Sequence, residues 1–210
     1  MSIAIPGKVV VFDYGEVISR VPSADDRRVL TDAAELAPDD ERFWEAYWRS
    51  RNQLDQGTLS IPDYWRGIAD ELGVDWNGAR VHRLWLADYR SWLSFDEGTL
   101  DILVDLQEGG TRLALLSNAG PDFGSYFRHG SLGSFFEEVF VSGELGLIKP
   151  SAEIFRAVLF ELGITAEQLV FIDNKEENVR GAEAIGAIGH VFTEASELRR
   201  FLTTLAASGE

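Results

Sequence analysis

Short apolar runs recur along the chain and alternate with stretches of helical periodicity. Runs of this length and composition are typical of buried parallel strands that carry helices on both faces. The intervening stretches include 151–163, where Ser151 is a plausible N-cap and Gly163 a stop, and 176–186, which ends at Gly186. This alternation predicts right-handed βαβ units. The apolar runs are 9–12, 113–116, 139–141, 170–172 and 188–192.

The interval 21–92 has a different pattern, because it contains no strand-like run and its apolar residues follow the helical period. All six tryptophans lie in it. We expect most of them on the inner faces of a small helical bundle and one or two along a pocket. Two helical faces carry this prediction, the first formed by Ile61, Tyr64, Trp65, Ile68 and Leu72 and the second by Val81, Leu84, Trp85, Tyr89 and Trp92.

These patterns predict an α/β protein in which a helical segment interrupts a parallel sheet just after its first strand. We expect residues 1–20 and 93–210 to form a Rossmann-like α/β core domain. Residues 21–92 should form an inserted α-helical bundle, here called the cap. Ligands of such sheets bind at the carboxyl ends of the strands, so chemistry is expected directly after the apolar runs.

Composition narrows the choice of partners and of chemistry. The 210 residues carry a formal charge of −16, which makes nucleic acid an improbable partner. The absence of cysteine excludes disulfides, thiolate metal sites and a cysteine nucleophile. The N-terminal residues do not have the pattern of a signal peptide, and no apolar run approaches ~20 residues. We therefore expect a cytoplasmic protein without a membrane partner.

Polar side chains of complementary chemistry follow four of the predicted strands. Asp13 follows the first strand, and Ser117 with Asn118 follows the second. Lys149 lies in the loop after the third, and Asp173 with Asn174 follows the fourth. Two carboxylates, a hydroxyl, amides and an ammonium at one edge of a sheet indicate a site for phosphate and a divalent metal.

Four motifs, "VVFDYGEVIS", "LALLSNAG", "GELGLIKPSAEIF" and "VFIDNKEENVRGAEAIG", carry a resemblance that covers nearly the whole chain. Together they resemble the haloacid dehalogenase (HAD) superfamily, in its branch with a helical cap after the first strand. Within it the first motif is most similar to the Asp-x-Gly group, which includes bacterial phosphatases acting on sugar 1-phosphates. The resemblance implies a hydrolase acting on a small phosphorylated metabolite, as a monomer or homodimer.

The resemblance assigns the phosphate chemistry to four positions. Asp13 would be the nucleophile that forms an aspartyl-phosphate. Ser117, the backbone of Asn118 and Lys149 would hold the oxygens of the transferring group.

The metal implied by the resemblance is Mg²⁺. Its ligands would be the Asp13 carboxylate, the backbone carbonyl of Gly15, and the side chains of Asp173 or Asn174.

Two positions depart from the family pattern. Most phosphatases of the superfamily carry an acid where this chain has Gly15, and that acid protonates the leaving oxygen. Its loss removes proton transfer worth ~10²- to 10⁴-fold, unless Glu16, a substrate hydroxyl or a cap residue supplies it. The superfamily also commonly places a second acid where this chain has Asn174, so weaker metal binding is expected.

Two alternatives stay open from the sequence. One is hydrolytic dehalogenation of a 2-haloacid, because "LALLSNAG" and the tyrosine after Asp13 are similar to those of dehalogenases that act without metal. The other is binding of a phosphometabolite or a protein without turnover, because two acids are missing.

Overall fold

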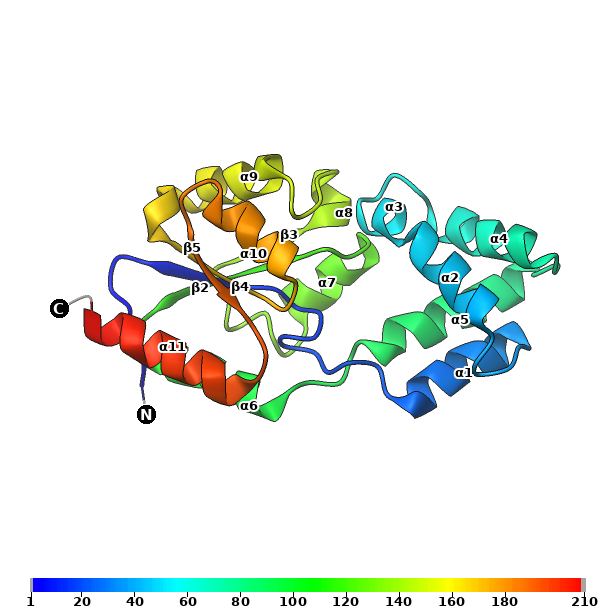
Figure 1. Cartoon of the computed structure of the whole chain (residues 1–210), viewed down its shortest axis with the longest axis horizontal. Helices are drawn as coiled ribbons and strands as arrows, with labels where there is room; N and C mark the ends of the chain where they lie inside the picture. The colour runs from blue at the N-terminus through cyan, green and yellow to red at the C-terminus, as the bar shows by residue number, and fades with distance from the viewer. Residues whose placement is uncertain (1, 209–210) are drawn as a thin grey trace.

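The computed structural model describes residues 2–208 and contains one parallel sheet with a separate group of helices beside it (Figure 1). The strand order is β3-β2-β1-β4-β5, which places the first strand of the chain at the centre. The predicted α/β fold is therefore confirmed. The strands are β1 (Val9–Phe12), β2 (Arg112–Ser117), β3 (Glu138–Val141), β4 (Leu169–Asp173) and β5 (Ile188–Val191).

The helices fall into two sets. The first, within the predicted cap, consists of α1 (Ala24–Ala34), α2 (Glu41–Arg49), α3 (Arg51–Asp55), α4 (Ile61–Leu72) and α5 (Gly78–Ser91). The second accompanies the sheet and consists of α6 (Glu97–Glu108), α7 (Asp122–His129), α8 (Ser142–Leu145), α9 (Ala152–Leu162), the 3₁₀ turn η1 (Ala166–Gln168), α10 (Glu176–Glu183) and α11 (Ala195–Ser208).

The central strand β1 explains why the sheet has a helical layer on both faces. All four of its residues are buried. Val10 and Phe12 pack on the side covered by α6, α7 and α11, whereas Val9 and Val11 pack on the side covered by α9 and α10. Alternate residues of a strand point to opposite faces, so an uninterrupted apolar run needs apolar partners on both.

In the cap, α4 shows how local sequence sets a helix. Ser60 accepts a hydrogen bond from the backbone N–H of Asp63 at the start, and Gly73 ends the helix with φ 69°. Between these caps, Tyr64, Trp65 and Ile68 are buried on the predicted face. They form the centre of a hydrophobic core that belongs to the cap alone.

The tryptophans divide between this core and the space near the sheet. Trp65 and Trp76 belong to the cap core, and Trp44 and Trp85 pack against it. Trp92 packs against the core of the sheet domain instead. Trp48 is 55% exposed.

The chain enters and leaves the cap along two adjacent segments. Ser19 and Phe95 form an isolated antiparallel bridge. Backbone hydrogen bonds from Arg20 N to Ser94 O (2.7 Å) and from Asp96 N to Ile18 O (2.9 Å) extend it. The cap is therefore attached through a two-stranded connection close to the end of β1.

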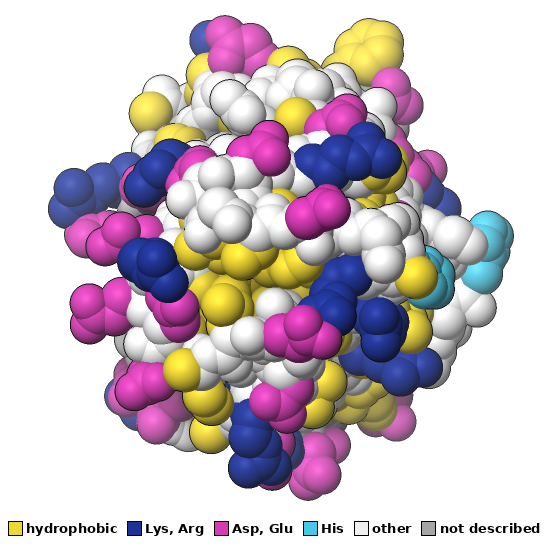
Figure 2. Space-filling view, turned by 90° about the vertical axis from the view of Figure 1, so that its right-hand side faces the viewer, with side chains coloured by type: hydrophobic (Ala, Val, Ile, Leu, Met, Phe, Trp, Pro, Cys, Tyr) yellow, Lys and Arg dark blue, Asp and Glu magenta, His cyan; other side chains and the backbone are white. Residues whose placement is uncertain are grey.

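The outer end of the cap carries charges of both signs. Figure 2 shows acidic and basic side chains interspersed around a central hydrophobic area, without a continuous basic surface on this face. None of the helices in residues 2–208 combines the length and the apolar character needed to cross a membrane.

Candidate active site

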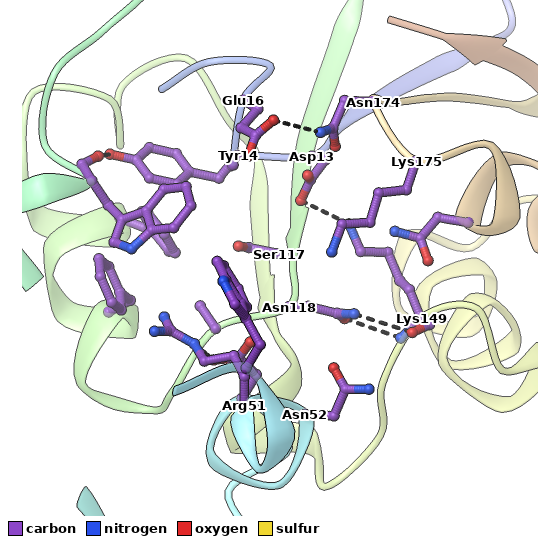
Figure 3. Close-up of a pocket in the computed structure, with 18 residues that line it drawn as sticks. Asp13, Tyr14, Glu16, Arg51, Asn52, Ser117, Asn118, Lys149, Asn174 and Lys175 are labelled. Carbon is purple, nitrogen blue, oxygen red and sulfur yellow. Dashed lines mark hydrogen bonds and ion pairs between the residues drawn. The ribbon is translucent and has the colours of Figure 1, made fainter. Parts of the chain in front are cut away.

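The carboxyl ends of three neighbouring strands bring the predicted site residues together. Phe12 is in register with Leu115 of β2 and with Ile172 of β4. Asp13, which follows Phe12, therefore lies between the ends of both neighbours, and Ser117 and Asp173 terminate them. The edge predicted from the apolar runs thus carries both predicted carboxylates, of which Figure 3 shows Asp13.

Lys149 joins these carboxylates. Its Nζ donates to Asp13 Oδ1 at 2.7 Å, to Asp173 Oδ2 at 2.7 Å and to the carbonyl oxygen of Leu116 at 2.9 Å. The lysine is 4% exposed, so these contacts lie away from bulk water. One cation between two carboxylates leaves the cluster with one uncompensated negative charge.

Burial controls the protonation of this cluster. It raises the pKa of Asp13 to about 6, an effect opposed by the ammonium of Lys149 and reinforced by the Asp173 carboxylate. Burial lowers the pKa of Lys149, but the two carboxylates outweigh it and hold that pKa above its ordinary value. Lys149 therefore remains an ammonium.

The two carboxylates differ in how many hydrogen bonds they accept from other residues. Asp173 Oδ1 accepts hydrogen bonds from Lys175 N (2.8 Å) and Asn178 Nδ2 (3.1 Å). Its Oδ2 accepts from Asn178 Nδ2 (3.0 Å) and Lys149. Three donor groups therefore make four hydrogen bonds to the Asp173 carboxylate, which has about four lone-pair sites. Asp13 has Lys149 as its side-chain donor and borders the cavity, so it is the carboxylate available to a substrate.

Asn118 positions the lysine loop. Its Nδ2 donates to the carbonyl oxygen of Lys149 at 3.1 Å, and its Oδ1 accepts from the backbone N–H of Lys149 at 3.0 Å. Ser117, one residue earlier, is buried at the wall of the cavity. The side chain of Asn118 is thus engaged with the loop, which leaves its backbone as the group predicted to contact phosphate.

Gly15 leaves room for a Cβ beside Asp13. A Cβ placed there would lie 3.8 Å from the Trp92 ring and 3.9 Å from Asp13 Oδ2, which are ordinary contact distances. The neighbouring Glu16 has φ 60° and accepts a hydrogen bond from Asn174 Nδ2 at 3.2 Å. As Figure 3 shows, its carboxylate is directed toward Asn174.

The oxygen donors near Asp13 fit a hard cation only in part. Within residues 2–208, no group of three or more His, Cys, Asp and Glu side chains is arranged to hold a metal ion. Carbonyl and amide oxygens from Gly15 and Asn174 would have to complete a set based on Asp13. Asp173 would have to exchange one of its four hydrogen bonds to ligate directly.

A cavity of about 170 Å³ lies between this edge and the cap. From the cap, α3 and its surroundings contribute Trp48, Arg51, Asn52 and Asp55 to its wall. Lys175 lines it from the sheet domain and points inward (Figure 3). Lys175 was not among the predicted site residues, although its position directly after Asn174, near the end of a strand, indicated that it could lie at the site.

The cap residues at this cavity belong to a buried charged cluster. Arg51 Nε donates to Asp55 Oδ1 at 2.9 Å, and its Nη1 donates to Asp88 Oδ2 at 3.0 Å. Arg51 also donates to the hydroxyl of Tyr47, which in turn donates to Asp88 Oδ1 at 2.6 Å. Burial raises the pKa of Asp55 to about 6 against the opposing effect of Arg51.

Several hydrogen bonds connect the cap to the sheet domain around the cavity. Ser142 Oγ donates to the carbonyl oxygen of Asp55 at 2.5 Å. Gln56 Nε2 donates to the carbonyl oxygen of Gly146 at 2.8 Å, and Trp85 Nε1 donates to Asp122 Oδ2 at 2.8 Å. The cap is therefore held against the loops that carry the site.

Similar proteins include phosphatases. A sesquiterpene phosphatase of Aspergillus oryzae, astK, is 25% identical over 90% of this chain and 91% of its own length. A D-ribitol-5-phosphate phosphatase of Bacteroides thetaiotaomicron is 24% identical over 96% of this chain and 99% of its own. A solved HAD family enzyme of that bacterium, in complex with magnesium and inorganic phosphate, has a TM-score of 0.70 at 22% identity, covering 91% of this chain and 98% of that one.

The family itself follows from a match along most of the sequence. A family model described as haloacid dehalogenase-like hydrolase matches residues 8–186, a range that includes every residue placed at the site above. The chain therefore belongs to the haloacid dehalogenase-like hydrolases.

Proposed function

We propose that this hydrolase cleaves phosphomonoesters through an aspartyl-phosphate on Asp13. The observation that carries the proposal is the Asp13 carboxylate, which borders the cavity while Lys149 Nζ lies 2.7 Å from its other side. Further support comes from the phosphatases among the similar proteins. The substrate would be a small phosphorylated metabolite.

The reaction needs two displacements at phosphorus. In the first, an Asp13 oxygen bonds to phosphorus while the ester P–O bond breaks and the alcohol leaves. In the second, water attacks the aspartyl-phosphate, releases inorganic phosphate and restores the carboxylate. Lys149, Ser117 and the backbone of Asn118 would hold the transferring oxygens, so the developing charge meets donors that are already in place.

We further propose magnesium dependence. The Asp13 carboxylate, the Gly15 carbonyl and the side chain of Asn174 or Asp173 would hold the ion. When bound, it supplies positive charge to the oxygens of the transferring phosphoryl group. A sheet edge with one uncompensated negative charge favours such a cation.

The absence of an acid at Gly15 bears on the leaving group. An alkoxide needs a proton as it departs, whereas anomeric sugar, aryl and acyl leaving groups depend on it less. We therefore propose a preference for phosphates with good leaving groups, such as the sugar 1-phosphates used by the Asp-x-Gly group.

The leaving-group proposal is tested by plotting log kcat/KM against the pKa of the leaving alcohol. A steep dependence is expected for the natural protein, and a shallower one for Gly15→Asp, because the added acid would protonate the leaving oxygen. Gly15→Ala is the matched control, since a Cβ at this position meets only ordinary contacts. Equal values of kcat/KM for alkyl and aryl phosphates in the natural protein would contradict the leaving-group proposal.

The activity itself is tested with p-nitrophenyl phosphate and magnesium. Phosphate release should disappear in EDTA and in Asp13→Asn. Chloride release from a 2-haloacid, undiminished by EDTA, would identify a dehalogenase instead. Binding of the phosphate ester without turnover by the natural protein would identify a non-catalytic binding protein.

A further inference from the structure

A second cavity of about 170 Å³ adjoins the catalytic one on the cap side. The two cavities share three lining residues, Glu16, Trp48 and Trp92, so they meet directly beside the loop after β1. An engineered apolar cavity of about 150 Å³ accepts benzene, so a space of this size holds a ring or a short hydrocarbon chain. Nothing in the proposed chemistry at phosphorus uses it.

The wall of the second cavity is largely apolar and aromatic. Its apolar and aromatic members are Val21, Pro22, Leu30, Trp44, Tyr47, Trp48 and Trp92. The guanidinium of Arg27 lies 5.8 Å from the centroid of the Trp44 ring. A wall of this composition recognises its ligand mainly by burying hydrocarbon surface.

The acidic members of the wall are already paired. Asp88 receives hydrogen bonds from Tyr47 and Arg51, and Asp26 receives them from Ser23 at the start of α1. These contacts leave the hydrocarbon surface as the main feature offered to a ligand. The carboxylate of Glu16, at the junction of the two cavities, disfavours a second anionic group on the same ligand.

Trp92 connects this wall to the nucleophile. A Cβ at Gly15 would lie 3.8 Å from its ring and 3.9 Å from Asp13 Oδ2, so the Trp92 ring and the Asp13 carboxylate lie on either side of the same point of the loop. The indole Nε1 of Trp92 is buried without a hydrogen-bond partner in residues 2–208. The Trp92 atom nearest to a Cβ at Gly15 is Cζ3, on the benzene half of the indole, so Trp92 presents apolar ring surface near the nucleophile.

We propose that the second cavity binds the apolar part of the phosphomonoester whose phosphate reacts at Asp13. This inference rests on the proposed phosphatase function and narrows its substrate class: among the good leaving groups proposed above, the second cavity favours hydrocarbon-substituted aryl monophosphates without a second anionic group over sugar 1-phosphates. Trp48 and Trp92 flank the ester at the junction, and Val21 and Leu30 contact the far end of the hydrocarbon.

The test compares phenyl phosphate with 4-n-butylphenyl phosphate, whose leaving phenols have nearly the same acidity. The butyl ester should have a kcat/KM at least about tenfold higher, because burying even one added methylene is worth roughly that factor. Val21→Asp should abolish this preference by placing a charge on the cavity wall. Val29→Asp is the matched control, since Val29 is 55% exposed against 54% for Val21 but does not line the cavity.

A binding experiment separates this inference from the proposed function. The affinities of both esters for Asp13→Asn, measured by calorimetry, should differ by the same factor of about ten or more. Equal affinities, or a preference that Val21→Asp leaves intact, would overturn the subsite. A Val21-dependent preference in binding without turnover of either ester by the natural protein would retain the subsite and reject the phosphatase.

Discussion

Two buried cations in this molecule each lie between two carboxylates, one in the sheet domain and one in the cap. Lys149 Nζ lies 2.7 Å from oxygens of Asp13 and Asp173. The guanidinium of Arg51 lies 2.9 and 3.0 Å from oxygens of Asp55 and Asp88. Both clusters border the same cavity. By charge and burial alone they are nearly equivalent.

The difference lies in position, because within residues 2–208 the carboxylates of Asp13 and Asp55 each accept a hydrogen bond from a single side-chain donor. In the cap, the planar fork of Arg51 binds both carboxylates and the Tyr47 hydroxyl binds Asp88 as well, which closes the network within the cap. In the sheet domain, Asp13 has one side-chain donor and lies at the carboxyl end of a central strand. The pKa of Asp13 and that of Asp55 are both raised to about 6, so a perturbed pKa does not distinguish a reactive carboxylate from a structural one.

Removing the cation of the sheet cluster should have the largest effect on activity. In Lys149→Met, two buried carboxylates face each other and must share a proton, which weakens Asp13 as a nucleophile. The variant also loses a charged donor to the transferring group. We expect kcat for p-nitrophenyl phosphate to fall by about 10³-fold, with the far-UV circular dichroism spectrum retained.

Lys8→Met is the matched control, because Lys8 makes an exposed hydrogen bond to the carbonyl oxygen of Glu167. It should keep the activity of the natural protein. If Lys149→Met kept more than about a tenth of that activity, the sheet cluster would be structural, like the cap cluster.

Breaking the cap cluster should instead lower stability. Asp88→Asn leaves Arg51 with one carboxylate in a buried setting, and loss of one partner of a buried ion pair costs about 3–5 kcal/mol. Urea unfolding measures the change. The control Asp25→Asn removes an exposed pair with Arg28 and should cost less than about 1 kcal/mol. Equal effects of the two variants would show that the cap cluster contributes no more than a surface ion pair.

The pH dependence of stability distinguishes Asp55 from exposed acids. Because burial raises its pKa from the ordinary 3.8 to about 6, folding binds protons here, and the stabilising contribution is present below pH 4 and lost as the pH rises through 6. The free energy of unfolding of the natural protein minus that of Asp55→Asn should therefore fall between pH 4 and 7, by up to about 3 kcal/mol.

Asp40→Asn provides a control of opposite sign, since Arg42 lowers the pKa of Asp40. The free energy of unfolding of the natural protein minus that of Asp40→Asn should rise with pH through the acid range. A flat difference for Asp55 would mean that Arg51 fully offsets the effect of burial.

The residues at the carboxyl edge of the sheet could be predicted from the sequence, because apolar runs mark the strands and the residues directly after them lie at that edge. An apolar run of three to five residues marks each strand, and the residue after it must lie at the carboxyl edge. Asp13, Ser117 and Asp173 follow from this rule alone. The role of Lys149 came from the resemblance, and the structure adds its position between the two carboxylates.

The side-chain contacts within the cap could not be predicted from the sequence, because they depend on how the helices pack against one another. Arg51 and Asp55 are one helical turn apart, but Asp88 reaches them from α5, 33 residues beyond Asp55. No periodic pattern specifies that meeting. Trp48 likewise lies on α2 beside buried Tyr47, yet it is exposed at the junction of two cavities. Which tryptophan faces the site depends on the orientation of the whole cap.

The smallest expected effect concerns the metal and is tested at Asn174. Asn174→Asp adds a carboxylate 3.2 Å from Glu16, and a divalent cation can balance two such charges. Magnesium should bind roughly tenfold more tightly, which corresponds to about 1.4 kcal/mol. In EDTA the two like charges should make the variant less stable than the natural protein, so the sign of the stability change should depend on magnesium.

Calorimetric titration and thermal unfolding, each with and without magnesium, measure both effects. Asn77→Asp is the matched control, because Asn77 caps α5 away from the site and aspartate caps a helix equally well. If Asn174→Asp bound magnesium no more tightly than Asn77→Asp, position 174 would not contact the ion. Metal binding would then depend on Asp13 and on Asp173, which would have to give up one of its four hydrogen bonds before it could ligate the ion.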